Sequence, residues 1–187
     1  MKHSAIRQHI IDTASELFYT NGYNRTGINM VIAESGVAKA TLYSHFKSKD
    51  DLCLAYLQDR NSSFLANIYS YCRAKPAGND QIIGLFDFLL EFFNSKAFNG
   101  CWCINTISEV AKDDVIIKAE IQHQKRVFLS LVQDLVFENK DKYTVVEAGK
   151  LARKIYLLYE SGVAESHLHK EDWPIESAKE MCIDLIA

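Results

Sequence analysis

Apolar side chains recur along this chain with the spacing of amphipathic helices. In residues 5–19 they stand three or four positions apart, so they share one face of a helix, and the same spacing returns in later segments. Turn signals separate these segments, among them Asn21-Gly22, the cluster at 75–80 and the polar stretch at 139–143. We find no alternating strand pattern, so the sequence predicts an all-α protein of about nine helices.

Cap and turn signals place the predicted helix boundaries. The expected helices span about 5–19, 27–36, 39–46 and 49–73, then about 81–95, a helix opening after Gly100, and about 113–137 and 144–168. The last helix is expected from Ser177 or earlier to Ala187 and is entered through Trp173-Pro174. Ser48 and Asp51 form a capping box that would start the fourth helix, and Thr26 is a plausible cap for the second.

The segment 36–52 has the pattern of a helix-turn-helix. Gly36 lets the chain turn sharply between two short helices, and Leu42 and Phe46 share one face of the second helix. The outward face carries small and polar side chains, namely Ala40, Thr41, Ser44 and His45, with Tyr43 beside them. Such a surface fits the major groove of DNA, and phosphate contacts are expected from Arg25, Thr26, Lys47 and Lys49. The alternative is a solvent-exposed helix in an ordinary bundle.

Composition and charge permit a nucleic-acid partner without demonstrating one. The formal net charge is −3, yet residues 1–60 carry seven basic and six acidic side chains. With 48% hydrophobic residues, 24% charged residues and 2 Pro, the chain is typical of a globular protein rather than a disordered one. There is no secretory leader and no apolar run of about 18 residues, so we expect a cytoplasmic protein with no membrane partner. The 5 scattered cysteines are expected to be reduced thiols.

Residues 5–52 resemble the amino-terminal domain of the TetR family of transcriptional regulators. They read AIRQHIIDTASELFYTNGYNRTGINMVIAESG and then GVAKATLYSHFKSKDDL, the two stretches sharing Gly36. The family pattern is A-x-x-L-F-x-x-x-G-Y-x-x-T, then I-A-x-x-x-G-V, then T-L-Y-x-H-F-x-x-K-x-x-L. The matching residues are Ala14, Leu17, Phe18, Gly22, Tyr23, Thr26, Ile32, Ala33, Gly36, Val37, Thr41, Leu42, Tyr43, His45, Phe46, Lys49 and Leu52.

The resemblance implies a DNA-binding domain of three helices and a larger domain for effector binding and dimerisation. The first would cover residues 1–48 and the second residues 49–187, beginning with a linker helix. Family members touch DNA at the positions held here by Thr26, Lys39, Ala40, Thr41, Tyr43, His45 and Lys49, and Ser44 and Lys47 lie on the same surface. One departure is Ala38, where the family commonly has Ser, so the third helix would lack a side-chain cap worth about 1 kcal/mol.

The stretch NGCWCINTISEV resembles a G-C-x-x-x-N-x-x-x-E segment of a TetR subgroup. Gly100, Cys101, Asn105 and Glu109 match it, and the resemblance places the segment at the sixth helix beside the inducer cavity. The expected effector pocket is lined by Phe88, Phe92, Trp102, Asn105 and Phe128, with simple core packing of the rings as the alternative. Cys101 is a candidate sensor thiol at the start of this helix, although a buried inert cysteine is the commoner case.

Two further patterns lie near the carboxy terminus. His167, His169, Glu171 and Asp172 are expected in a solvated loop rather than a metal site, and no metal or cofactor is predicted. A stripe of small and apolar residues predicts a four-helix dimer interface and consists of Val146, Gly149, Ala152, Ile155, Tyr156, Tyr159, Gly162 and Val163.

These features predict a homodimeric transcriptional repressor released from a pseudo-palindromic operator by a small apolar or aromatic effector. The expected partners are double-stranded operator DNA, a second copy of the chain and the effector. One alternative is a repressor that senses electrophiles or oxidants through Cys101. Another, from a different class, is a helical ligand-binding protein or enzyme without DNA binding, although no nucleophile with a base, phosphate loop or metal motif supports an enzyme.

Overall fold

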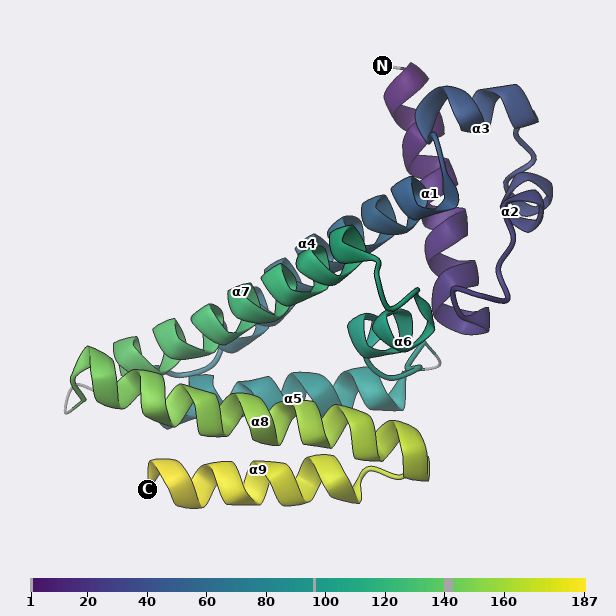
Figure 1. Cartoon of the computed structure of the whole chain (residues 1–187). Helices are drawn as coiled ribbons and strands as arrows, with labels where there is room; N and C mark the ends of the chain where they lie inside the picture. Colours follow the sequence, from purple (N-terminus) through teal and green to yellow (C-terminus); the bar gives the residue numbers. More distant parts are fainter. Residues whose placement is uncertain (1, 96, 140–142) are drawn as a thin grey trace. The chain divides into compact units, whose positions relative to one another are not determined.

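The chain is helical throughout the part that the computed structural model describes, which is residues 2–95, 97–139 and 143–187. Within these ranges it has nine helices and no strand (Figure 1). The helices are α1 (Lys2–Asn21), α2 (Ile28–Ser35), α3 (Lys39–His45), α4 (Lys49–Arg73), α5 (Asn79–Asn94), α6 (Trp102–Glu109), α7 (Val115–Asn139), α8 (Val145–His169) and α9 (Trp173–Ile186). The predicted all-α class is confirmed. None of the helices in the described residues is long and apolar enough to cross a membrane.

The turn between α2 and α3 follows the prediction. Gly36 has φ +66°, a left-handed conformation that favours glycine, and its N–H donates to the Ile32 carbonyl at 3.1 Å. Ala38 precedes α3 and provides no side-chain cap. At the start of α4, the Asp51 N–H donates to Ser48 Oγ at 3.0 Å. The Asp51 carboxylate accepts from the Lys47 N–H at 3.1 Å, so the capping box closes one residue earlier than its usual form.

Packing divides the chain into two compact units. The first comprises Met1–Ser63 and Trp102–His123, and the second comprises Phe64–Cys101 and Gln124–Ala187. The division differs from the boundary after residue 48, because α6 and the start of α7 pack with the amino-terminal helices. The predicted boundary after residue 48 separates a DNA-binding part from an effector-binding part, and it stays a prediction.

The core of the first unit holds α3 in place. Leu42 and Phe46 are 0% and 2% exposed, which confirms them as the apolar anchors of the helix-turn-helix. They share the buried set with residues from α1, α2 and α4, including Ile10, Ile11, Ala14, Phe18, Val31, Leu52 and Leu57. Burying side chains of this size favours folding by about 1.5–3 kcal/mol each. The polar face of α3 is therefore turned away from the core.

The core of the second unit takes up six of the eight residues of the predicted dimer stripe, whereas Val146 is exposed and Tyr156 is half-buried. Gly149, Ala152, Ile155, Tyr159, Gly162 and Val163 are all buried inside this unit itself. A Cβ on Gly162 would lie 3.5 Å from Ile175 of α9 and 3.6 Å from Leu89 of α5, so the small residue permits close helix packing within one chain. The helical spacing was correct, but the six buried residues pack within one chain, against α5, α7 and α9. A dimer through the remaining exposed surface of α8 stays a prediction.

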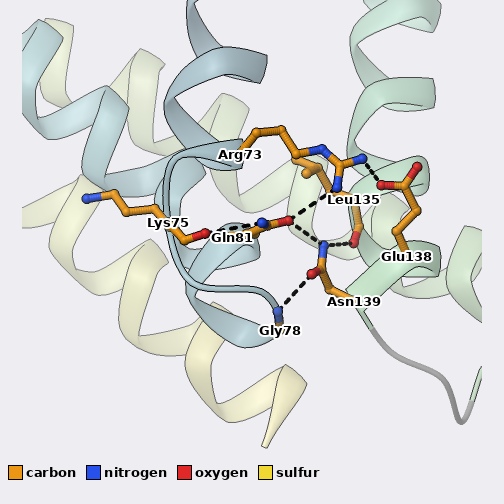
Figure 2. A network of polar contacts seen from close by, with 7 residues as sticks. All are labelled: Arg73, Lys75, Gly78, Gln81, Leu135, Glu138 and Asn139. Carbon is orange, nitrogen blue, oxygen red and sulfur yellow. Dashed lines mark hydrogen bonds and ion pairs between the residues drawn. The ribbon is translucent and has the colours of Figure 1, made fainter.

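Side-chain amides close a junction in the second unit where α4 and α7 end and α5 begins (Figure 2). Asn139 Oδ1 accepts from the Gly78 N–H at 2.7 Å, and Asn139 Nδ2 donates to the Leu135 carbonyl at 2.9 Å and to Gln81 Oε1 at 3.0 Å. Gln81 Nε2 donates to the Lys75 carbonyl at 3.2 Å. These bonds satisfy backbone groups that helix ends leave without a helical partner.

Arg73 adds charge to the same junction. Its guanidinium forms an ion pair with Glu138 and lies 3.4 Å from Gln81 Oε1 (Figure 2). Both charged side chains are about one third to one half exposed, so the ion pair is expected to contribute about 0–1 kcal/mol. The amides therefore contribute most of the fixed geometry.

Candidate nucleic-acid interface

The outward face of α3 is small and polar, as predicted. Lys39, Ala40, Tyr43 and Ser44 are exposed, and Thr41 and His45 are half-buried. The Tyr43 side chain is 43% exposed, whereas its neighbour Leu42 is 0% exposed, so adjacent residues serve opposite faces. Ser44 donates its hydroxyl to the Thr41 carbonyl at 2.7 Å, which leaves its oxygen able to accept from an incoming group. An α-helix with this surface can enter a major groove.

Two lysines follow α3 at the start of α4. Lys47 is exposed, whereas Lys49 is half-buried with its ammonium 3.9 Å from the centroid of the Tyr23 ring. Partial burial lowers the pKa of Lys49. The Tyr23 hydroxyl donates to the Asp50 carboxylate, and burial together with this bond raises the pKa of Tyr23. The aromatic ring therefore orients the Lys49 ammonium.

Thr26 is a correction to the predicted DNA-contacting set. It is 0% exposed, and its hydroxyl lies 2.8 Å from the Gly22 carbonyl oxygen and 3.1 Å from that of Leu17. The side chain closes the α1–α2 turn and cannot reach a phosphate. It does not cap α2 either, because the residue before that helix is Gly27. Arg25 beside it is exposed.

The carboxy-terminal end of α6 contacts the α1–α2 turn, which the sequence did not reveal. Glu109 Oε2 accepts from the Asn24 N–H at 2.6 Å, and Asn24 Nδ2 donates to the Glu109 carbonyl at 2.9 Å. These residues are 85 positions apart. The subgroup pattern pointed to Glu109 but could not supply its partner, because sequence spacing carries no signal for a contact of this length.

The amino-terminal end of α6 is tied to the same unit. The Arg60 guanidinium of α4 lies 3.6 Å from the centroid of the Tyr19 ring and 5.6 Å from that of Trp102. Cation–π contacts of this kind contribute about 0.5–2 kcal/mol each. Both ends of α6 are thus bound to the unit that contains the helix-turn-helix.

The residues of the predicted effector pocket are distributed between the two units. Trp102 and Asn105 belong to the first unit. Phe88 and Phe128 belong to the second, where both rings pack edge-on against Phe64, at centroid distances of 6.1 and 5.2 Å.

The remaining predicted pocket residue, Phe92, packs against Phe98 at 5.4 Å. Two surface grooves lie elsewhere, one beside Leu54 and Ile116 and the other beside Tyr69 and Leu131. The five-residue pocket stays a prediction.

Cys101 lies immediately before α6 and differs from the deeply buried cysteines. Its sulfur is 3.1 Å from Lys125 Nζ, and the thiol is half-buried. The Lys125 ammonium also contacts both carboxylate oxygens of Glu160, at 2.6 and 2.7 Å. Burial raises the pKa of Glu160, although the neighbouring ammonium opposes this shift.

The buried thiols have a different environment. Burial raises the pKa of Cys53 and of Cys72 to about 12, and it does the same for Cys182. A thiol with so high a pKa has almost no thiolate at neutral pH, so these three residues are poor nucleophiles.

The two histidines near the carboxy terminus, His167 and His169, contact different partners. His167 Nε2 lies 3.1 Å from Asn99 Oδ1, and His169 Nε2 lies 3.4 Å from a Glu165 carboxylate oxygen. Both belong to the last turn of α8 rather than to a loop. Among the described residues, no three His, Cys, Asp or Glu side chains come together as a metal site.

Comparison with known proteins shows that this chain is similar to transcriptional regulators. A family model described as "Bacterial regulatory proteins, tetR family" matches residues 10–56. The "Fatty acid metabolism regulator protein" of Bacillus subtilis is 21% identical over 129 residues, which cover 69% of this chain and 65% of the relative. The "HTH-type transcriptional activator FasR" of Mycolicibacterium smegmatis is 22% identical over 142 residues, covering 76% of this chain and 62% of the relative. The chain therefore spans less than two thirds of the length of either relative.

The likeness to a solved structure extends over nearly the whole chain. SCO4454, described as a TetR-family transcriptional regulator from Streptomyces coelicolor, is 25% identical with a TM-score of 0.87, covering 98% of this chain and 95% of that chain. Both SCO4454 and FasR are described as transcriptional regulators. The amino-terminal helices of this chain are therefore similar to those of the TetR family of regulators, and its all-α architecture is similar to that of a TetR-family regulator over nearly the whole chain.

Proposed function

We propose that the protein is a DNA-binding transcriptional regulator that reads the major groove with α3. The carrying observation is the division of α3 into a buried face at Leu42 and an exposed polar face at Tyr43 and Lys39. Base contacts would come from Ala40, Thr41, Tyr43, Ser44 and His45, and phosphate contacts from Lys39, Lys47 and Lys49. Phosphate contacts set the register of such a helix, and base contacts give it specificity.

A second copy of the chain is the proposed protein partner. Large apolar side chains remain exposed on α8 and α9, and they are Val145, Val146, Leu157, Leu168, Trp173, Met181 and Ile183. A two-fold dimer through this surface would present two α3 helices to successive major grooves, whose half-sites lie about 34–36 Å apart on the DNA. We propose a cytoplasmic repressor, with activation, the activity named for one relative, as the alternative outcome.

A small apolar or aromatic molecule is the proposed effector. We also infer membership of the subgroup with the G-C-x-x-x-N-x-x-x-E segment, because Glu109 of that segment bonds to Asn24 in the turn that leads into the helix-turn-helix. The relative named for fatty acid metabolism favours an acyl chain as the first probe. Oleate and decanoate should lower operator affinity about 5- to 150-fold if α6 couples the sites at the usual strength.

Operator binding tests the proposal. Wild-type protein is used to select its site from a random DNA library, and Tyr43→Ala and Lys49→Ala are then titrated against that site. Both should bind at least about tenfold more weakly, and Lys49→Ala should lower the salt dependence by about one phosphate contact. Lys150→Ala, an exposed charge change on α8, is the matched control. Unchanged operator affinity in both α3 and α4 variants would reject the assignment.

A second candidate function is release by an electrophile at Cys101, and the Lys125 contact favours it. An ammonium 3.1 Å from the sulfur stabilises the thiolate, which can add to an activated alkene such as N-ethylmaleimide. The sulfur forms a bond to one alkene carbon, and the other carbon takes a proton from water. Cys101→Ser should abolish release by this reagent, while Cys53→Ser should not. Release that persists in Cys101→Ser would eliminate this function.

A further inference from the structure

A pair of reciprocal hydrogen bonds joins α6 to the α1–α2 turn within the first unit. The Glu109 carboxylate accepts from the Asn24 N–H at 2.6 Å, and the Asn24 side-chain amide donates to the Glu109 carbonyl at 2.9 Å. Glu109 is the last residue of α6, so its carbonyl is one of those that a helix leaves without a partner. Asn24 therefore caps α6, and Glu109 in return fixes the turn.

Gly22 is fitted to this contact. Its φ is +91°, and a Cβ there would lie 2.4 Å from one Glu109 carboxylate oxygen and 3.0 Å from the other. Only glycine leaves room for the carboxylate at this distance. The close approach is a second feature of the turn, independent of the hydrogen bonds, that depends on Glu109.

The turn itself has little freedom to absorb a displacement. The buried Thr26 hydroxyl bonds within the segment, to the carbonyl oxygens of Leu17 or Gly22. Tyr23, between Gly22 and Asn24, is held by Asp50 at the start of α4. A movement of Glu109 would therefore displace Tyr23, because the turn has little freedom to absorb it by a change in conformation.

Tyr23 connects the turn to a DNA-contacting charge. Its ring lies under the Lys49 ammonium, with 3.9 Å between the nitrogen and the ring centroid. A shift of the turn would move this ring and change where the ammonium points. Lys49 is thus a residue of the proposed DNA surface whose ammonium is supported by an aromatic ring.

We propose that Glu109 and Asn24 form a latch that positions Lys49 for the DNA phosphate, with Tyr23 as the intermediate. Glu109 is then a positioning residue of the DNA-binding surface, although it lies on α6 and does not touch DNA. The latch rests on the proposed DNA-binding function and adds a route by which a change at α6 alters operator affinity.

A double-mutant cycle with the selected operator tests the latch. Glu109→Gln and Asn24→Asp are each expected to weaken operator binding about 5- to 30-fold, the latter because it places a carboxylate beside Glu109. Lys49→Ala should cost much less affinity in the Glu109→Gln background than in wild type, because its contact is already impaired. Glu120→Gln is the control, since Glu120 lies in the same unit but accepts from Gln58 of α4 at 3.3 Å.

Hydrogen exchange gives a readout that does not require DNA. The Asn24 amide should exchange faster in Glu109→Gln than in wild type, whereas amides of α8 should not change. Wild-type operator affinity in both latch variants, or equal costs of Lys49→Ala in the two backgrounds, would overturn the latch. Failure of the wild type to select any DNA sequence would instead overturn the proposed function, and the two failures are therefore distinguishable.

Discussion

Different chemical groups stabilise the α1–α2 turn of the first unit and the helix junction of the second unit. Carboxylates hold the turn, since Glu109 accepts from the Asn24 N–H and Asp50 accepts from the Tyr23 hydroxyl. Neutral amides hold the junction, where Gln81 and Asn139 bond to backbone groups and to each other (Figure 2).

The difference indicates which region is suited to regulation. A charged hydrogen bond is stronger than a neutral one, but its strength depends on ionisation, screening and the position of one side chain. The Gln81 and Asn139 amides have no charge to lose, and the Arg73–Glu138 ion pair beside them is expected to contribute only about 0–1 kcal/mol, so the junction is less sensitive to these changes. The position of the turn next to the proposed DNA surface therefore depends on one charged side chain, Glu109, whereas the junction in the second unit joins three helix ends through several bonds.

Gly22→Ala should have the largest effect on stability. A left-handed non-glycine residue costs about 1–3 kcal/mol, and expulsion of the Glu109 carboxylate would add the loss of a charged hydrogen bond, about 1.5–3 kcal/mol. Urea denaturation measures the loss of unfolding free energy. Gly22→Ala should cost less in a Glu109→Ala background than in the wild-type protein. Additive costs would mean that the carboxylate does not occupy the space beside Gly22.

Asn139→Ala should lower the free energy of unfolding by about 1–3 kcal/mol, because it leaves the Gly78 N–H without this acceptor and removes one of the donors to Gln81 Oε1. Operator affinity of the folded variant should stay within about twofold of wild type. Asn94→Ala, at the end of α5, is the control. A large loss of operator affinity would contradict the purely structural role of the junction.

Helix starts allow a smaller test of the two units. Thr144 caps α8 in a reciprocal box with Glu147, so Thr144→Ala should cost about 1 kcal/mol. Ala38 gives α3 no side-chain cap, so Ala38→Ser should instead gain up to about 1 kcal/mol. Thermal melting measures the stability change of both variants. A loss of stability in Ala38→Ser would show that the turn before α3 cannot accept a side-chain cap.

The smallest expected effect is a pH dependence at His167 in the second unit. Burial lowers the pKa of His167 from its ordinary 6.5, so the unfolded chain binds more protons than the folded chain as pH falls through that value. The contribution of His167 to unfolding free energy should therefore decrease below about pH 6.5. His167→Gln should remove this part of the acid destabilisation, measured by urea titration at pH 7 and 5. If the unfolding free energy of His167→Gln depends on pH as that of the wild type does, burial of the His167 ring is not the cause of the acid destabilisation.

Local chemistry in the sequence predicted much of the first unit. Gly36, Leu42 and Ser48 each act within a few residues of their own position, as a left-handed turn, a buried anchor and a helix cap. Interactions this short leave a pattern in the sequence. Thr26 was misread because a threonine before a helix can cap it or turn inward, and only packing selects between the two.

Long-range contacts could not be predicted in the same way. The stripe on α8 had the right period, but its burial against Leu89 and Ile175 depends on which helices fold beside it. The Lys125 contact to Cys101 joins positions 24 apart, and a thiol by itself does not indicate its neighbour. A pattern identifies the face of a helix and leaves its partner open.

The sequence by itself determined the helices, the turn at Gly36 and the polar face of α3, because backbone conformation, caps and periodicity are local properties. Only the tertiary structure decided that Thr26 faces inward, that α6 belongs to the same unit as the amino-terminal helices and that Glu109 meets Asn24. These outcomes depend on which distant surfaces meet when the chain folds, and a side chain's partner across 85 residues has no counterpart in local spacing.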